Sequence, residues 1–253
     1  MASRLIARNL TKRFGTRAAI ENVSFEVRER EFVAVLGPSG AGKTTLFKCM
    51  TGLMAPDSGG VEVAGLDVRT LRGRERRHIA VVFQQFNLVS RLSALGNVLA
   101  GRLGHVPAWR GWTRRFERPD ALLALECLER VGLLAHAAQR ADTLSGGQQQ
   151  RVAIARALAQ QPDIIVADEP VASLDPTIGA GILELLHGIC REGVSVVCSL
   201  HQVHFARQFA DRIVGLVDGR VTVDAPTVDF DRQAADRLYG GVSAQSQAQP
   251  QGA

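Results

Sequence analysis

The chain has 253 residues, of which 46% are hydrophobic and 22% charged, with a formal net charge of +5. These are the proportions of an ordinary globular protein, and no apolar run approaches the roughly 20 residues that a membrane-spanning helix needs. They exclude a protein that is itself a membrane pore, and the length allows one large domain without a second fold.

The start of the chain and its cysteines both indicate a reducing compartment. Residues 1–5 lack the apolar core of about 7 to 15 residues that a secretory signal has. Cys49, Cys127, Cys190 and Cys198 are far apart, form no CxxC pair and stand among apolar neighbours. This is typical of buried thiols rather than of disulfides or zinc ligands. We therefore expect the chain to stay in the cytoplasm.

Short apolar runs that alternate with segments of helical spacing predict an α/β fold with a mainly parallel sheet. Because the carboxyl ends of parallel strands meet at one edge of a sheet, the residues that follow these runs are expected to share one site. The runs are Phe32 to Leu36, Ile79 to Phe83, Ile164 to Ala167 and Val194 to Leu200. The residues that follow them are Gly37 to Thr44, Gln84, Asp168 with Glu169, and His201.

The periodicity becomes helical between about residues 87 and 161, which predicts an inserted helical subdomain. Within it, the segment from Gly104 to Pro119 contains Trp109, Trp112 and several arginines. We expect that segment to be a loop or a partner-facing excursion. Residues 1–242 are expected to form a single domain, and residues 243–253, rich in Gln, Ser and Ala, a disordered tail.

Residues 37–44 fit the GxxxxGK[ST] pattern of a phosphate-binding loop. In such a loop, glycines let backbone N–H groups surround phosphate oxygens, Lys43 reaches the β and γ phosphates, and the Thr44 hydroxyl binds Mg²⁺. A glycine-rich turn without a ligand is the alternative, but the apolar run before the loop and the helix-forming residues 45–50 after it argue against that. The expected phosphate-binding residues are Gly37, Pro38, Ser39, Gly40, Ala41, Gly42, Lys43, Thr44 and Thr45.

One apolar run ends in two carboxylates, Asp168 and Glu169. Acidic residues at strand ends are usually only solvated. Together with the phosphate loop, however, Asp168 is expected to associate with Mg²⁺ and Glu169 to orient or deprotonate water.

The segment Leu144-Ser145-Gly146-Gly147-Gln148 carries more than a helix cap. Ser145 and Gln148 have capping-box spacing, which predicts a helix from here through Ala159 whose N-terminal amides can face an anion. Capping explains the serine and the glutamine but not the adjacent glycines. The segment resembles the signature sequence of the ABC ATPases. With its motifs in that family's order, the chain is identified as a member over roughly residues 6–237.

The resemblance implies the ABC ATPase form of the P-loop NTPase fold, with a mainly parallel core sheet, an antiparallel β subdomain and an inserted helical subdomain. Phe14 matches the aromatic residue that stacks on adenine, although tyrosine is common there. Gln84 matches a glutamine that contacts Mg²⁺ or the attacking water and links the site to the membrane subunit. Asp175 matches a loop that crosses to the opposite site of a dimer, and His201 matches the switch histidine that contacts the γ-phosphate. Each of these alone could be an ordinary polar or core residue.

The family's arrangement also implies a composite site. Two copies face head to tail, and each ATP lies between the phosphate loop of one copy and the segment Ser145, Gly146, Gly147 and Gln148 of the other. The implied cofactors are ATP and Mg²⁺, with Lys43, Gln84, Glu169 and His201 as catalytic residues and Thr44, Gln84 and Asp168 near the metal.

The implied partners follow from the same resemblance. They are a second copy of the chain, membrane permease subunits and, indirectly, a periplasmic or lipid-anchored solute-binding protein. The implied location is the cytoplasmic face of the bacterial inner membrane. The densest basic cluster, residues 71–77, is interrupted by Glu75. We therefore expect a solvated, docking or membrane-adjacent face there rather than a nucleic-acid groove.

Four local segments reduce the range of cargoes to consider. Residues 82–92, 97–104, 139–142 and 168–176 look like the ATPase of bacterial phosphonate importers, and the excursion at 104–119 fits that subgroup. His204 stands where that pattern has an acidic residue, which puts only local surface charge in doubt. Import of phosphite, hypophosphite or another small oxyanion is the near alternative.

Two further hypotheses have less support. A soluble ABC ATPase of DNA repair or translation is favoured only by the isoelectric point of about 9.5. A non-hydrolysing scaffold for a carbon–phosphorus lyase complex is opposed by the intact Lys43, Asp168, Glu169 and His201.

Overall fold

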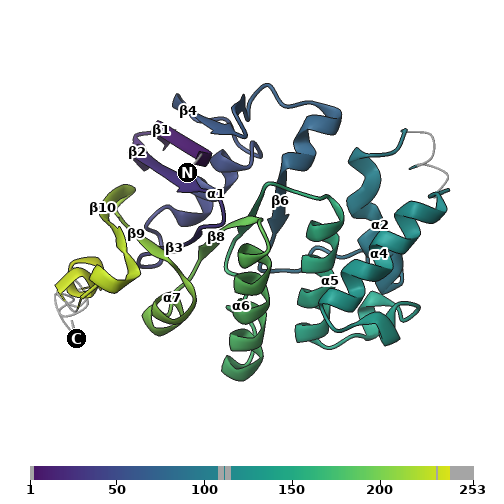
Figure 1. Ribbon diagram of the computed structural model, residues 1–253. Helices are drawn as coiled ribbons and strands as arrows, with labels where there is room; N and C mark the ends of the chain where they lie inside the picture. Colours follow the sequence, from purple (N-terminus) through teal and green to yellow (C-terminus); the bar gives the residue numbers. More distant parts are fainter. Residues whose placement is uncertain (1–2, 108–110, 112–114, 232, 240–253) are drawn as a thin grey trace, which may run out of the picture.

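The computed structural model describes residues 3–107, 111, 115–231 and 233–239. Its strands form a six-stranded sheet, in the order β10-β9-β3-β8-β7-β6, and a four-stranded sheet, in the order β2-β1-β4-β5 (Figure 1). Trp109, Trp112 and the predicted tail lie outside the described residues. The strands are β1 (Ser3–Phe14), β2 (Arg17–Arg28), β3 (Phe32–Leu36), β4 (Ser58–Val63), β5 (Leu66–Asp67), β6 (Ile79–Val82), β7 (Ile164–Ala167), β8 (Ser195–Ser199), β9 (Arg212–Val217) and β10 (Arg220–Pro226).

The described helices connect these strands. The α-helices are α1 (Lys43–Met50), α2 (Ala94–Ala100), α4 (Arg118–Arg130), α5 (Gly146–Ala159), α6 (Pro176–Arg191) and α7 (Val203–Phe209). Short 3₁₀ turns are η1 (Gly73–His78), η2 (Gly101–Gly104), η3 (Leu134–His136), η4 (Ala141–Thr143) and η5 (Thr227–Asp229). A last helical segment covers 233–239.

The predicted mainly parallel sheet is confirmed. Strands β3, β8, β7 and β6, which correspond to the four apolar runs, pair in parallel, and β9 pairs in parallel with β3. Only β10 is antiparallel, to β9. Strand β3 is buried along its whole length. Because successive side chains point to opposite faces of a strand, Val33 and Val35 enter one core, and Phe32, Ala34 and Leu36 enter the other.

Each face of the sheet is covered by different elements (Figure 1). On one face, α1 is sandwiched between the two sheets: its Leu46, Phe47 and Met50 pack with residues of β1, β2 and β3 in one core. On the other face, α5, α6 and α7 contribute to the second core. The phosphate-loop candidate therefore joins β3, which is buried on both faces, to α1, which is packed between the two sheets. Both ends of the loop are held by buried elements.

The segment between β6 and β7 is helical. Helices α2, α4 and α5 pack against one another there. Helix α5 starts where the capping pattern predicts: the Ser145 hydroxyl accepts a hydrogen bond from the Gln148 amide at 3.3 Å, and the Gln148 side chain accepts one from the Ser145 amide at 2.9 Å. Both arms of the box are formed, which stabilises the first turn.

All four cysteines are buried and free, as predicted. Burial raises the pKa of the Cys49 and Cys127 thiols to about 11. They are therefore neutral thiols at physiological pH and behave as small hydrophobic side chains.

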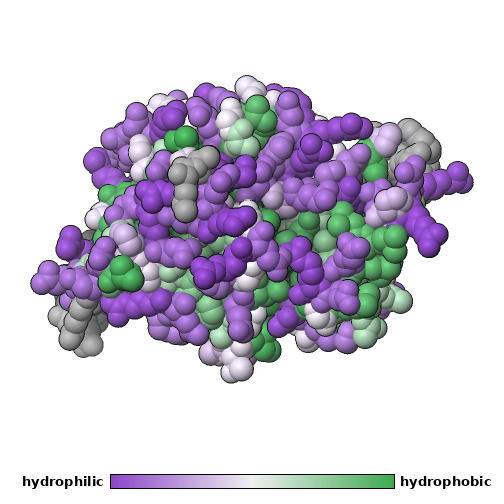
Figure 2. Space-filling model, viewed as in Figure 1, coloured by the Kyte–Doolittle hydropathy of each residue, from purple (hydrophilic) through white to green (hydrophobic). Residues whose placement is uncertain are grey.

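The surface is mostly hydrophilic on the face that Figure 2 shows, with its largest hydrophobic area over the helices between β6 and β7. In that part of the chain Leu103, Leu122 and Leu134 are exposed. None of the helices in the described part of the chain combines the length and hydrophobicity needed to cross a bilayer.

Candidate functional site

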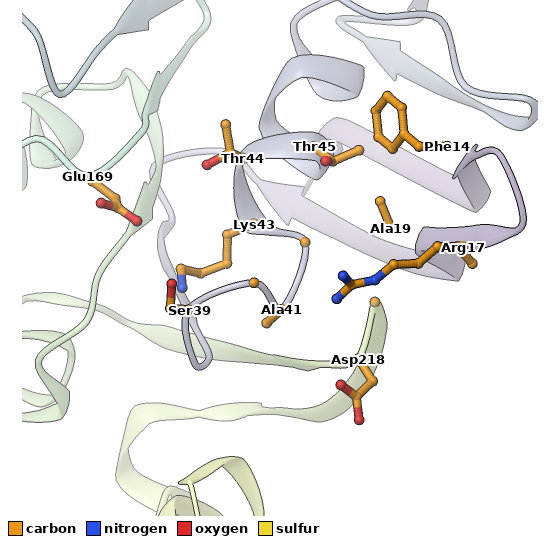
Figure 3. A pocket seen from close by; sticks show the side chains of 14 residues that line it. Phe14, Arg17, Ala19, Ser39, Ala41, Lys43, Thr44, Thr45, Glu169 and Asp218 are labelled. Atoms are coloured by element: carbon orange, nitrogen blue, oxygen red, sulfur yellow. The ribbon is translucent and has the colours of Figure 1, made fainter. Parts of the chain in front are cut away.

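A cleft of about 530 Å³ opens at the carboxyl end of β3, between the two sheets. Figure 3 shows Glu169 on one side of the phosphate loop and Phe14 on the other. The cleft thus brings together three segments that the sequence assigns to one site. Its lining consists of Phe14, Arg17, Ala18, Ala19, Ser39, Gly40, Ala41, Gly42, Lys43, Thr44, Thr45, Glu169, Asp218 and Gly219.

The phosphate loop is held from outside by the carbonyl oxygen of Ala19 on β2. A side chain added at Gly42 (φ +102) would place its Cβ 2.2 Å from that oxygen, and one added at Gly219 (φ +76) would place it 2.7 Å away. The Gly219 amide also donates to the carbonyl of Ala41 at 3.0 Å. Only glycine fits such close backbone approaches. The loop is therefore fixed by β2 and by the β9–β10 turn, which the sequence does not place near it.

Lys43 is almost fully buried, and its side chain turns back onto its own loop. The ammonium donates to the carbonyl of Gly37 at 2.7 Å and to that of Pro38 at 3.1 Å. Burial lowers the pKa of Lys43, while the negative charges of Glu169 and Asp168 raise it. An ammonium has three donors, so one remains for a phosphate oxygen in the cleft.

Asp168 connects β7 to the phosphate loop. Its carboxylate accepts hydrogen bonds from the Thr44 hydroxyl and, at 2.9 Å, from the Ser199 hydroxyl. Burial is the main influence on the pKa of Asp168 and raises it, and the neighbouring Glu169 raises it further. The Ser199 hydroxyl in turn accepts from the Glu169 amide at 2.7 Å. Ser199, at the end of β8, is a site residue that sequence reasoning missed, because a lone serine carries no signal.

Glu169 and His201 contact each other directly. The distance between Nε2 of His201 and Oε1 of Glu169 is 2.7 Å. The Glu169 backbone has φ +50, which is unfavourable for a residue with a side chain and is found where the surroundings impose it. Strands β7 and β8 are neighbours, so the predicted convergence of these two strand ends is present.

The far end of the cleft is aromatic and polar. Phe14 is 53% exposed, and the Lys12 ammonium lies 6.0 Å from its ring centroid. Figure 3 shows the Arg17 side chain reaching toward the phosphate loop, with Asp218 below it. Neither Arg17 nor Asp218 was predicted from the sequence, because each reaches the cleft only through the folding of β2 and the β9–β10 turn.

The signature segment does not line this cleft. Ser145 to Gln148 form the start of α5, in the helical part of the chain. One of the two glycines that capping left unexplained permits close packing: a Cβ on Gly147 would lie 2.6 Å from Cγ2 of Ile178 in α6, whereas one on Gly146 would make only ordinary contacts. Gln84 is exposed just beyond β6, and Asp175 caps α6, where its carboxylate accepts from the Thr177 amide at 2.8 Å. None of these predicted residues lines the cleft.

Comparisons with known proteins identify a family and several similar proteins. A protein-family model described as "ABC transporter" matches residues 20–172. The chain is 49% identical to the hypophosphite import ATP-binding protein of Stutzerimonas stutzeri, over 92% of this chain and 70% of that protein. It is 47% identical to a phosphonates import ATP-binding protein of Rhodopseudomonas palustris, over 93% and 89%. It is also similar to the solved structure of a dimeric ATP-binding cassette in a post-hydrolysis state bound to ADP and Pi, with a TM-score of 0.75 and 38% identity over 88% of this chain and 98% of that one.

Proposed function

Since this chain belongs to the ABC transporter family of ATP-binding proteins, we propose that it hydrolyses ATP to drive a membrane importer whose cargo is a phosphonate. The observation that carries the proposal is the cleft. It is lined by phosphate-loop residues 39–45, which include Lys43, by the aromatic ring of Phe14 and by the carboxylate of Glu169.

The cleft assigns a task to each group. The loop amides and the Lys43 ammonium counter the charge of the phosphates, and Phe14 offers its exposed ring to the adenine. Glu169 orients or deprotonates the attacking water. The His201 imidazole contacts one oxygen of the Glu169 carboxylate and is assigned to contact the γ-phosphate when ATP is bound. Gln84 follows the neighbouring strand β6 and is assigned to Mg²⁺ or to the attacking water.

The residues present fit Mg²⁺. Thr44 and Asp168 place a hydroxyl and a carboxylate in mutual contact, and oxygen ligands are what Mg²⁺ prefers. Burial and Glu169 raise the pKa of Asp168, and a cation would relieve that unfavourable charge. In the proposal Thr44, Asp168 and Gln84 hold the ion, which when bound neutralises charge on the phosphates.

A second copy of the chain completes the site. The signature segment at the start of α5 presents backbone amides but lies away from its own cleft, so it serves the cleft of a partner copy. The dimeric cassette with bound ADP and Pi supports this arrangement. In this proposal residues 1–242 form one domain, with residues 87–161 as its helical subdomain.

A second cleft, of about 420 Å³, suits a membrane subunit. It lies between the end of α1, η1, β6 and α5, directly before Gln84. The Arg156 guanidinium lines it, donates to the carbonyls of Phe86 and Asn87 at 3.0 and 2.6 Å, and has a pKa lowered by burial alone. Its other lining residues are Thr51, Leu53, Val68, Leu71, Arg76, Ile79, Val81, Phe83, Asn87 and Gln160.

An amphipathic segment with a carboxylate matches a cleft that is lined by apolar and polar side chains and contains two guanidinium groups. We assign that segment to the permease, with a solute-binding protein acting on the outer side. This assignment sets the chain at the cytoplasmic face of the membrane.

The cargo is tested by reconstitution. The chain, its permease and its solute-binding protein are placed in liposomes, and ATPase activity is measured with methylphosphonate or 2-aminoethylphosphonate. Stimulation by these alkylphosphonates at micromolar concentration is expected, and absence of stimulation rejects the phosphonate assignment.

One specific observation favours a second candidate cargo. The relative at 49% identity is a hypophosphite import ATP-binding protein, although several phosphonates import ATP-binding proteins match at nearly the same level. Stimulation by hypophosphite or phosphite but not by alkylphosphonates would select that candidate and leave the ATPase assignment intact.

A further inference from the structure

The only tyrosine of the chain, Tyr239, lies between the phosphate loop and the histidine turn. It is half-buried at the end of the helical segment 233–239. Its hydroxyl group is 3.3 Å from the carbonyl oxygen of His201 and is also hydrogen-bonded to the backbone of Gly37. One side chain from the C-terminal end thus contacts both segments that carry the proposed chemistry.

The directions of these two bonds follow from the donors available. A phenol has one proton, and a carbonyl oxygen can only accept, so the hydroxyl donates to His201. The bond with Gly37 lowers the pKa of Tyr239, as expected of a backbone N–H that donates to the phenol oxygen. Burial is the larger influence and raises that pKa, so the hydroxyl stays protonated and can make both bonds at neutral pH.

The Tyr239 hydroxyl lies where the next backbone hydrogen bond between two parallel strands would be expected. Strands β3 and β8 are parallel neighbours, and their last direct bond runs from the Leu200 amide to the Val35 carbonyl at 3.1 Å. Beyond it the two chains separate, one into the phosphate loop and the other into the histidine turn. The Tyr239 hydroxyl joins the next donor on one strand to an acceptor on the other.

The tyrosine itself is firmly placed. Its neighbour Leu238 is fully buried and occupies the space beside Gly215, where an added Cβ would lie 2.4 Å from Cδ2 of Leu238. Upstream, the Arg207 guanidinium donates to the Phe230 carbonyl at 2.8 Å. The segment is therefore anchored on β9 and α7.

We propose that Tyr239 is a positioning residue for His201: its hydroxyl fixes the histidine backbone relative to the phosphate loop. The imidazole needs a fixed backbone position because the His201 side chain is 44% exposed, so few neighbours hold it in contact with Glu169. The inference rests on the proposed ATPase function and assigns to that site a residue from the C-terminal segment.

The test is a double-mutant cycle on the full-length chain, with steady-state ATPase as the readout. Tyr239→Phe keeps the ring and its packing and removes only the hydroxyl. We expect kcat to fall about three- to tenfold, with KM for ATP changed less than about twofold, because one neutral hydrogen bond is lost and the nucleotide contacts are kept. In a His201→Ala background the same substitution should change kcat by less than about 1.5-fold, because its effect passes through the histidine.

A matched control removes a hydroxyl from a sheet position away from His201. Thr222 on β10 contacts the Gly215 carbonyl at 3.5 Å. Thr222→Val should leave kcat unchanged, and melting curves of all variants confirm that they are folded.

Two results overturn the inference alone: a wild-type kcat for Tyr239→Phe, or an equal fold-change with and without His201. A wild-type chain without any ATPase activity would instead reject the proposed function, and this inference with it.

Discussion

The Nε2 atom of His201 lies 2.7 Å from Oε1 of Glu169, so the side chains of the proposed switch and of the proposed water-activating group contact each other. One carboxylate oxygen is therefore engaged, and the imidazole fixes the direction of the other. The pair spans two neighbouring strand ends, and a shift of the histidine turn would change where the free carboxylate oxygen points.

Removal of the Glu169 charge should stop hydrolysis and preserve nucleotide binding. Glu169→Gln keeps the side chain's shape but cannot accept a proton, so kcat should fall at least about 100-fold. The chain should then elute as an ATP-bound dimer in size-exclusion chromatography. Glu184→Gln, an exposed change on α6, should behave as wild type. Turnover of ATP by Glu169→Gln at the wild-type rate would contradict the role of Glu169.

Neutralising Asp168 should stabilise the protein at neutral pH. Burial raises the pKa of Asp168 above its ordinary value of 3.8. At a pH between the ordinary pKa of Asp168 in the unfolded state and its raised pKa in the folded state, the folded state binds more protons. Stability therefore falls as the pH rises through this window. At neutral pH the charge is destabilising in full. Asp168→Asn should therefore raise Tm there by on the order of 2–4 °C, measured without added Mg²⁺ or nucleotide.

The pH dependence provides the check on that prediction. The gain from Asp168→Asn should shrink as the pH is lowered toward 3.8, because the raised pKa makes the folded wild type take up its proton before the unfolded state does. The Asp218→Asn change, at an exposed aspartate of the cleft, is the control and should leave Tm unchanged. A lower Tm for Asp168→Asn at neutral pH would show that hydrogen bonds outweigh the buried charge.

Phe14 should affect nucleotide affinity without affecting stability. Its ring is 53% exposed, so Phe14→Ala removes little buried area. Loss of stacking on the base should raise Kd for ATP about tenfold. Titration with a fluorescent ATP analogue measures this, and Phe14→Tyr, which keeps the ring, should bind like wild type. An unchanged Kd for Phe14→Ala would place the adenine elsewhere.

Gly219 should contribute to ATP affinity although it belongs to none of the predicted motifs. Gly219 and Gly65 have nearly the same φ, +76 and +79, but an added Cβ meets the Ala19 oxygen at 2.7 Å only at Gly219. Both alanine variants carry the strain of a positive φ, and Gly219→Ala adds the clash with β2, so both should melt lower. Only Gly219→Ala should also raise Kd for ATP, by about fivefold. Equal Kd values in the two variants would disprove the coupling.

Local patterns predicted the parallel sheet and the phosphate loop because their signals are short. Strands β3 and β7 are buried on both faces, so each is a continuous apolar run, and the loop is one uninterrupted motif. The start of α5 was predictable for a similar reason, since both partners of the capping box lie within four residues.

Contacts between distant segments escaped prediction. The Ser199 hydroxyl bridges Asp168 and Glu169 from 31 and 30 positions away in sequence, and serine at a strand end is common. Tyr239 contacts His201 only because the C-terminal segment folds back over β9. Arg17 shares this property, because it enters the cleft through the pairing of β2 with β1. The role of such residues can be recognised only once the fold shows which groups they contact.

The β9–β10 turn has a practical consequence for protein engineering. Exposed hairpin tips usually tolerate inserted tags and epitopes. Here Gly219 donates to Ala41 and accepts from the Glu21 amide at 2.8 Å, so an insertion would pull on the phosphate loop. The turn at Gly65, where nothing lies within 4 Å of an added Cβ, is the better fusion point. The length of this hairpin is thus constrained by its contacts with β2 and with the phosphate loop.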